Sequence, residues 1–424
     1  MGKFYSDMKI SLDGIIFVKK SQIAFYVFCA AIMLAYWGSL MPWFLWPILK
    51  YNNFIVALIL FLSFYISFYL SSENIFNREQ YGLPTLMAMI VITFMRLLHG
   101  AQVIGVAEGL LIAFVFFSLF KLDTVYLQKL MRIICITMAA FLLVSMTAFL
   151  LFLLGFPFPS TAAMTEDGMY NFDNYYLFLT GENSFFFIPR FHSVFLEPGH
   201  LGTATSFLLL SQVGRWKKWY NIVLLIATLI TFSLAAYVLL VLIMFASAWI
   251  QHKKFFLKML VIVIIMAGAG IGSFFYNQGD NMLYTMIVER LEVNDGKIAG
   301  DNRVTGSFEA AYDDFIESDD IWFGRGYKME DWGFGNAGYR VFIYDNGLIC
   351  LFLVFVFFLS ALLYCHNRRA ALCVLLIGSA AFWVRATPFH YYFFLPLFAL
   401  PYRTDLSSIP KASGQVAGSE DHVS

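Results

Sequence analysis

The sequence predicts an all-α polytopic membrane protein with about twelve transmembrane helices, and three observations carry that prediction. Of 424 residues, 60% are hydrophobic and only 13% are charged, whereas soluble domains are about half apolar and about a quarter charged. The apolar residues form runs of roughly 17 to 25, the length that crosses a hydrocarbon core about 30 Å thick. Two long segments of mixed charge, 156–198 and 276–340, interrupt these runs.

The amino-acid composition also excludes other classes of protein. The aromatic share is 19%, with 48 Phe, and this suits a lipid-facing surface with interfacial aromatic belts. The net charge is zero, so there is no electrostatic case for nucleic acid as a partner. The cysteines lie in apolar runs or at one helix end, so we expect neither disulfides nor a cysteine-based metal site.

The apolar runs predict the spans directly. The first run follows Lys19 and Lys20 and is a retained span rather than a signal peptide, because it is long and lacks a small-residue cleavage site. The run 219–250 is too long for one crossing, so we divide it at Thr231–Ser233. The predicted spans are residues 22–41, 53–70, 83–98, 101–120, 131–155, 199–213, 219–232, 235–250, 257–275, 341–364, 370–385 and 389–401.

The distribution of basic residues predicts the orientation. With the N-terminus in the cytoplasm, the inside segments hold 18 Lys and Arg and the outside segments hold 9, in agreement with the positive-inside rule. Both termini are then cytoplasmic, and the loops 156–198 and 276–340 are periplasmic. Residues 1–406 form a single transmembrane domain, and the polar tail 407–424 is expected to be a disordered cytoplasmic segment.

The end of the first loop gathers ionisable residues where the chain enters a span. Arg190, His192, Glu197 and His200 fall within eleven residues. Ionisable groups at a bilayer boundary cost free energy and are functional candidates for that reason. The alternative is structural: Arg190 extends its charge toward the water, and Glu197 caps the next helix.

The second loop supplies further cations. Arg290, Arg303 and Arg340 are candidates for binding a pyrophosphate, because a guanidinium offers bidentate hydrogen bonds and keeps its charge. Alternatively, they pair with acids of the same loop. Neither loop contains Asp-x-Asp or His-x-x-x-His, so the sequence predicts no metal site and no cofactor.

Three short motifs agree with one known family. Arg190 is followed seven residues later by Glu197-Pro198, which opens a span. Thr231-Phe232-Ser233 precedes another apolar helix. Gly324-Arg325-Gly326-Tyr327 is followed about twenty residues later by Tyr344-Asp345-Asn346-Gly347-Leu348-Ile349. With two large outer loops among many spans, this pattern resembles the Wzy-type O-antigen polymerases and the related O-antigen ligases.

The resemblance implies a glycosyltransferase of the bacterial inner membrane. Its donor would be an oligosaccharide repeat unit linked to undecaprenyl pyrophosphate, and its product an O-antigen, capsule or exopolysaccharide. The partners that the resemblance implies are this lipid-linked oligosaccharide, membrane lipid and a chain-length regulator protein. We expect Glu197 to be the proton acceptor, with His200 as second choice, while Arg190, Arg290, Arg303 and Arg340 stabilise the pyrophosphate.

One departure separates polymerase from ligase. Ligases of this kind carry a His about eleven residues before the Gly that corresponds to Gly347, and Asn336 stands at that distance here. Asn is no general base, so a polymerase is favoured, with Asn336 and Tyr339 as substrate-binding residues. The remaining alternative, a flippase for lipid-linked oligosaccharides, would be expected to spread charge through its spans, whereas here nearly all charge lies at the span ends.

Overall fold

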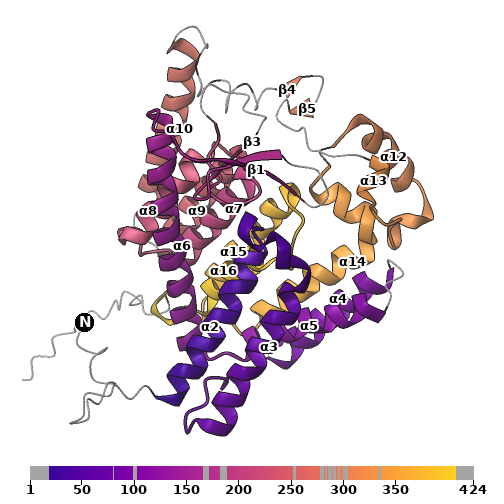
Figure 1. The fold of residues 1–424 in the computed structure, drawn as a ribbon. Helices are drawn as coiled ribbons and strands as arrows, with labels where there is room; N and C mark the ends of the chain where they lie inside the picture. The colour runs from indigo at the N-terminus through magenta and orange to yellow at the C-terminus, as the bar shows by residue number, and fades with distance from the viewer. Residues whose placement is uncertain are drawn as a thin grey trace, which may run out of the picture.

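The computed structural model shows a mainly helical protein (Figure 1). It describes residues 19–79, 81–98, 103–165, 171–181, 189–251, 255–276, 304–332 and 336–406, with residues 281, 284, 289, 293, 294, 297 and 298. Each of the twelve predicted apolar runs contains a helix, and the predicted break at Thr231–Ser233 is confirmed. The tail 407–424 lies outside the described residues.

The N-terminal helices pair as hairpins. Helix α2 packs against α3, α4 packs against α5, and α14 lies against α4 (Figure 1). Helix α3 lies between a 3₁₀ segment and a π-helical turn, which lengthen it at both ends. The bounds are α2 Lys20–Gly38, η1 Trp43–Tyr51, α3 Asn52–Tyr65, η2 Ile66–Leu70, α4 Gly82–Leu98, α5 Val103–Lys121 and α14 Tyr339–Leu362.

Helix α6 (Thr124–Leu153) begins seven residues before the predicted span 131–155. The reason is local: the Asp123 carboxylate accepts a hydrogen bond from the Val125 N–H at 2.8 Å. Such an N-cap satisfies a backbone donor that the first turn of a helix leaves without a partner. The residues 124–130, which precede the predicted span, therefore form the first turns of helix α6.

The central helices surround α7 and α16. Helix α7 packs against α8, α9 and α16. Helices α7 and α16 have 14 and 9 residues, so at 1.5 Å per residue they are about 21 and 14 Å long. All nine residues of α16 are buried, so its apolar sequence faces protein. The bounds are α7 Pro198–Ser211, α8 Trp219–Ile230, α9 Leu234–Gln251, α10 Phe255–Phe275, α15 Arg368–Val384, α16 Tyr391–Ala399, η6 Leu400–Tyr402 and η7 Thr404–Leu406.

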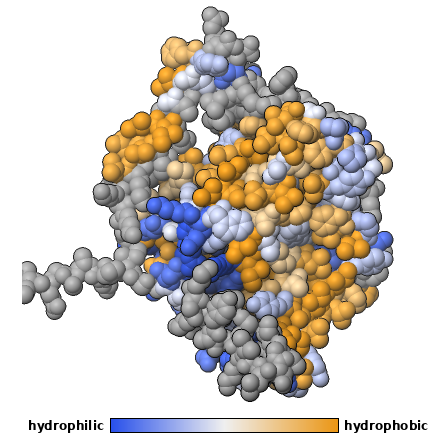
Figure 2. Space-filling view, turned by 60° about the vertical axis from the view of Figure 1, so that its left-hand side comes forward, coloured by the Kyte–Doolittle hydropathy of each residue, from blue (hydrophilic) through white to orange (hydrophobic). Residues whose placement is uncertain are grey.

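The outward faces of several helices are apolar. Phe54, Leu58 and Phe61 of α3 are each at least 60% exposed, and hydrophobic residues cover wide areas of the face in Figure 2. Soluble monomers rarely expose apolar patches of this extent. Among the described residues, five helices are long and apolar enough to cross a bilayer: Lys20–Gly38, Trp43–Leu70, Thr124–Leu153, Leu234–Gln251 and Tyr339–Leu362. The fold is thus consistent with a helical membrane protein.

The two long loops contain secondary structure of their own. The first holds an antiparallel sheet in the order β1-β2-β3, in which Ala162 lies opposite Asp173, and Asp173 opposite Thr180. The all-α prediction did not include these strands, which are too short for alternation to reveal. The bounds are β1 Thr161–Met164, β2 Asn171–Asn174, β3 Leu179–Gly181, β4 Val293–Asn294, β5 Lys297–Ile298, α12 Gly306–Ile316, η5 Asp319–Trp322 and α13 Met329–Trp332.

Two glycine-containing motifs meet at a kink in α14. Gly347 has φ 75° and ψ 173°, which breaks the helix. There the N–H of Arg325 donates to the Tyr344 carbonyl at 2.8 Å, and the N–H of Tyr327 donates to the Asp345 carboxylate at 2.6 Å. The segment Gly324–Tyr327 therefore docks on the broken helix and joins the second loop to the helix bundle.

Candidate functional site

The segment between Arg190 and Glu197 is a buried turn held from three sides. The Ser193 hydroxyl donates to the Ser145 hydroxyl of α6 at 2.8 Å. The Leu179 N–H of β3 donates to the Ser193 carbonyl at 2.8 Å, and the Trp43 N–H donates to the Val194 carbonyl at 3.0 Å. Ser193 has φ 55°, a conformation that persists only where surroundings enforce it. The ionisable side chains at both ends of this turn therefore have a rigid support.

Glu197 forms an ion pair with Arg385. The Arg385 Nη2 donates to the Glu197 Oε2 at 2.5 Å, and the two side chains are only 13% and 27% exposed. Glu197 occupies the N-cap position of α7, but its side chain makes no capping hydrogen bond. Glu197 thus stands at the helix N-terminus, where an acid is favoured, and its carboxylate contacts a cation from the α15–α16 connection.

Gly199 makes room for this ion pair. A Cβ atom at Gly199 would lie 2.5 Å from Arg385 Nη2, closer than side-chain atoms tolerate. Pro198 begins α7, at a position where proline is favoured because the helix needs no N–H there. The sequence Glu197-Pro198-Gly199 therefore supplies the carboxylate, the helix start and the space for the guanidinium.

Two histidines, the buried His200 and the half-buried His390, lie beside the pair. The ring centroids of His200 and His390 are 5.9 and 5.7 Å from that of Tyr392. The Tyr392 hydroxyl is 3.0 Å from the Thr387 hydroxyl. The Nδ1 atoms of both histidines are buried and have no hydrogen-bond partner within the described part of the chain. Buried polar atoms without partners are uncommon, so two at one place mark a site suited to a polar ligand.

A third histidine, His192, is held neutral. Its Nδ1 is 2.5 Å from the Phe195 carbonyl, and because a carbonyl only accepts, Nδ1 carries the proton. Burial lowers the pKa of His192 to about 4; the Phe195 hydrogen bond opposes that effect, and Arg190 and Glu197 act on it with opposite signs. His192 therefore lies within the electrostatic range of both residues, with its Nε2 as an acceptor.

Arg190 is anchored to the turn between α8 and α9. Its Nε donates to the Thr231 carbonyl at 3.1 Å, and the adjacent Phe191 N–H donates to the Ile230 carbonyl at 3.3 Å. Phe232 in this turn has φ 48°. The structure thus brings together two motifs that the sequence separates by about forty residues. Helix α7 packs closely against the Thr231 turn, since a Cβ at Gly202 of α7 would lie 2.9 Å from the Thr231 hydroxyl oxygen. This packing holds the turn in place.

The second loop approaches the same region through Tyr339. Its ring centroid is 4.1 Å from that of Trp383, two residues before Arg385. Arg340 contacts Glu309 at 3.5 Å and lies over the Tyr312 ring. The alternative that the second-loop arginines pair with acids of the same loop therefore has support for Arg340, because Glu309 is its partner.

Asn336 has a clear structural contact. Its Oδ1 accepts from the Thr305 N–H at 2.7 Å, and its Nδ2 donates to the Trp332 carbonyl at 3.3 Å. It therefore ties the start of α12 to the end of α13. Arg290 and Arg303 lie outside the described residues.

Sequence reasoning missed three members of the cluster: Arg385, His390 and Tyr392. They lie at the facing ends of the predicted spans 370–385 and 389–401. The signal was present, because Arg385 and His390 are ionisable residues at a span boundary, the same argument that singled out Arg190 and Glu197. What the sequence did not show is that these two boundaries meet.

A second polar contact lies between the ends of other helices. Arg96 Nη2 of α4 is 3.2 Å from Glu108 Oε2 of α5, and Asn53 Nδ2 of α3 donates to Glu108 Oε1 at 3.0 Å. Arg96 is in the last turn of its helix and Asn53 in the first turn of its own. Among the residues that were placed, no group of three His, Cys, Asp or Glu could hold a metal ion.

Comparison with known proteins adds no family to these observations. No family model, no curated protein and no solved structure matches the chain. The arrangement of Arg190, Glu197, His200 and Arg385 is therefore the basis on which a function is assigned.

Proposed function

We propose that the chain is a metal-independent glycosyltransferase of the bacterial inner membrane. It would polymerise undecaprenyl-pyrophosphate-linked oligosaccharide repeat units into O-antigen, capsule or exopolysaccharide on the periplasmic face. The observation that carries this proposal is the Glu197–Arg385 ion pair beside His200 and His390, at the end of α7 that follows the first loop. Neither a helix cap nor a solvated surface accounts for that arrangement.

The reaction makes two demands on such a site. The acceptor hydroxyl attacks the anomeric carbon, the bond from that carbon to the pyrophosphate oxygen breaks, and undecaprenyl pyrophosphate leaves with its negative charge. The hydroxyl proton passes to a base. Arginines held in place stabilise the charge on the leaving group, and Arg190 and Arg340 are the described candidates. Glu197 is the first candidate for the base and His200 the second.

The structure adds one role to this scheme. Arg385 donates a hydrogen bond to the Glu197 carboxylate, so it restrains the direction in which the base points. Arg385 is therefore a positioning residue in this proposal.

We extend the proposal to the membrane arrangement, with twelve crossings, both termini in the cytoplasm and both loops in the periplasm. The 18 to 9 distribution of basic residues supports it. Short helices such as α7 and α16 are compatible with crossing, because irregular backbone at membrane depth is tolerated where protein surrounds it. Reporter fusions after Thr180 and Gly300 are expected to report the periplasm, and one after Arg369 the cytoplasm; any reversal contradicts the orientation.

The polymerase is favoured over the ligase and the flippase on two grounds. Asn336 stands where the resemblance implies a ligase histidine, and its amide is engaged in holding the loop. The ionisable side chains of the site, among them Glu197 and Arg385, belong to helix ends, whereas a transport path would need polar groups through the depth of the spans. A separate protein that regulates chain length is a proposed partner.

Deletion of the gene tests the proposal. A polymerase deletion is expected to leave a single repeat unit on its normal final acceptor, because a separate ligase still acts. Long polymer stranded on the lipid carrier would instead identify a ligase. Purified enzyme supplied with lipid-linked repeat units is expected to stay active in excess chelator; a loss that Mg²⁺ or Mn²⁺ restores would contradict metal independence.

A further inference from the structure

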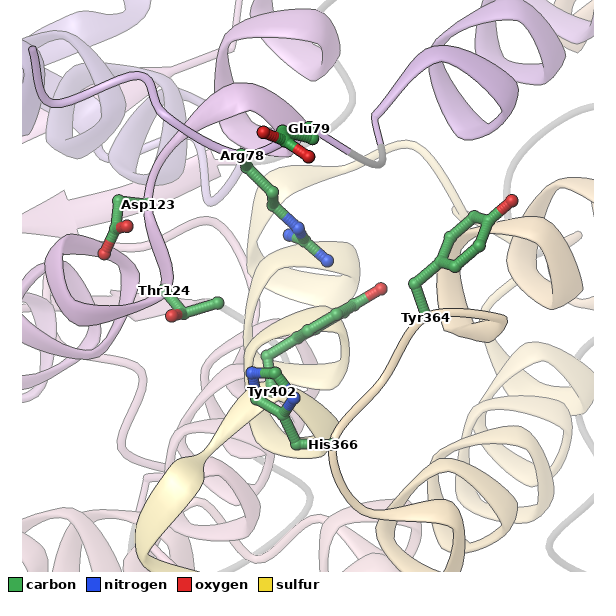
Figure 3. A pocket seen from close by; sticks show the side chains of 7 residues that line it. All are labelled: Arg78, Glu79, Asp123, Thr124, Tyr364, His366 and Tyr402. Atoms are coloured by element: carbon green, nitrogen blue, oxygen red, sulfur yellow. The ribbon is translucent and has the colours of Figure 1, made fainter.

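A polar pocket lies at the opposite end of α15 from Arg385. Helix α15 runs from Arg368 to Val384, and the pocket borders the connection that precedes its first residue. Four separate parts of the chain form the pocket, which has a volume of about 240 Å³ (Figure 3). Its lining residues are Arg78, Glu79, Asp123, Thr124, Tyr364, His366 and Tyr402.

Arg78 is the central group of this pocket. Its guanidinium carbon lies 3.7 Å from the centroid of the Tyr402 ring and 5.3 Å from that of Phe398, and Figure 3 shows the guanidinium above the Tyr402 ring. Stacking of this kind stabilises the cation through its face and leaves its N–H edge for hydrogen bonds. The guanidinium edge is thus suited to an anionic oxygen.

The N–H groups at the edge of the Arg78 guanidinium do not all have hydrogen-bond partners within the described residues. Its Nη1 is buried and has no hydrogen-bond partner within the described residues. Two carboxylates line the same pocket, yet within those residues no ion pair of 4.0 Å or less joins either of them to Arg78. A buried N–H group without a hydrogen-bond partner costs free energy, so this arrangement fits a site whose partner is a ligand.

The two acidic residues of the lining, Glu79 and Asp123, indicate that another part of the ligand is positively charged. Asp123 lies at the start of α6, where one of its carboxylate oxygens accepts the Val125 N–H, and Glu79 is exposed. A ligand bearing only negative charge would be repelled by these carboxylates, and one bearing only positive charge would be repelled by Arg78. A zwitterion with a phosphate and a nearby ammonium satisfies both halves.

We propose that this pocket binds a phosphoethanolamine group, with the phosphate against the Arg78 guanidinium and the ammonium between Glu79 and Asp123. The group has two possible sources, a phosphatidylethanolamine headgroup and free phosphoethanolamine. The exposed Tyr364 lines the pocket, and the exposed Arg368 follows two residues after His366 of the lining. Basic residues at a membrane surface attract lipid headgroups, so the lipid is the expected source.

Lipid retention by the full-length protein tests the proposal directly. The purified, delipidated protein is offered phosphatidylethanolamine, phosphatidylglycerol or phosphatidylcholine in detergent, and bound lipid is counted by native mass spectrometry. One phosphatidylethanolamine is expected to be retained in preference to the other two. Soluble O-phosphoethanolamine is expected to displace it, and inorganic phosphate is expected to do so far less well.

Variants assign the retained lipid to the pocket. Arg78→Gln is expected to weaken retention about tenfold or more, as loss of a charge-assisted hydrogen bond implies. Glu79→Gln removes a carboxylate from an exposed position and is expected to reduce the preference for phosphatidylethanolamine over phosphatidylglycerol. The matched control is Arg369→Gln, at the same end of the bundle but outside the pocket lining, which is expected to retain the lipid as the unmodified protein does.

The outcomes separate the possible sources. Displacement by O-phosphoethanolamine together with lipid retention supports the lipid headgroup, and binding of O-phosphoethanolamine without lipid retention supports the free compound. Equal retention in Arg78→Gln and Arg369→Gln, or an unchanged preference for phosphatidylethanolamine in Glu79→Gln, overturns the proposal. Because Glu79 is exposed, its variant remains informative even if Arg78→Gln fails to fold.

Discussion

The Arg385 guanidinium reaches the Glu197 carboxylate at 2.5 Å across 188 residues of sequence. One partner opens α7 and the other follows α15, so the contact joins the end of the first loop to the C-terminal helices. Both side chains are largely buried. The predictions below test whether this pair and its neighbours perform chemistry or only hold the fold.

Neutralising one member of the pair is expected to cost both stability and activity. Glu197→Gln or Arg385→Gln leaves the other charge unpaired, with a loss of about 2 kcal/mol, and polymer is expected to disappear. The double variant Glu197→Gln with Arg385→Gln is expected to regain stability but not polymer. Thermal unfolding and polymer length on gels measure the two effects.

The control for that experiment is Arg325→Gln. Arg325 pairs with Asp314 and Asp320, whose carboxylates are mostly exposed, and surface pairs contribute about 1 kcal/mol or less. Polymer is expected to remain. Normal polymer in the Glu197→Gln variant would remove Glu197 from the mechanism and move the search for the base to His200.

Gly199→Ala is expected to abolish polymer without changing any charge. The added methyl group would meet Arg385 Nη2, so the guanidinium must move away from Glu197. Gly82→Ala is the matched control, because it too stands at the start of a helix and a Cβ there meets nothing within 4 Å. Equal activity in the two variants would show that the position of Arg385 is not critical.

Arg190 is expected to require its guanidinium rather than its charge alone. Arg190→Ala is expected to leave protein in the membrane but no polymer, and Arg190→Lys to restore little. A lysine ammonium keeps the charge but loses the bidentate geometry. Its single nitrogen atom cannot replace both the guanidinium Nε that donates to the Thr231 carbonyl and the guanidinium nitrogens that face a ligand. Full polymer length in the Lys variant would show that charge alone suffices.

Acid is expected to destabilise the protein through His192. Because burial lowers its pKa from 6.5 to about 4, the unfolded state binds more protons between these values. Neutral His192 therefore makes its full contribution to the free energy of unfolding above pH 6.5. This contribution is lost as the pH falls toward 4, and the free energy of unfolding is lower by about 2 kcal/mol at pH 5. Thermal unfolding measured from pH 7.5 to 5 reports this loss.

The matching variant is His192→Gln, which keeps a donor for the Phe195 carbonyl and removes the titrating group. It is expected to reduce the loss of stability between pH 7.5 and 5. The exposed His366 provides the control, since His366→Gln is expected to leave the pH dependence unchanged. An undiminished acid sensitivity in His192→Gln would rule out this explanation.

The apolar runs of the sequence by themselves determined where helices form. Each run is a local pattern, and a backbone surrounded by apolar side chains satisfies its own hydrogen bonds within a helix. Thr231–Ser233 likewise marked a break, which the structure has at Phe232. The kink at Gly347 falls inside the predicted span 341–364, and the sequence pattern did not predict it. At Asp123 the side chain accepts a hydrogen bond from the backbone of the first helical turn, and helix α6 therefore begins seven residues before the predicted boundary.

Only the tertiary structure decided which helix ends meet. Arg190 and Glu197 stand out in the sequence because charge at a membrane boundary is costly, but nothing local connects them with Arg385, His390 or the 231–233 turn. Those contacts depend on packing across many residues, such as that of α7 against α8, α9 and α16. The same packing buried α7 and α16 inside the protein, so their apolar sequences reflect protein neighbours where the sequence alone suggested lipid.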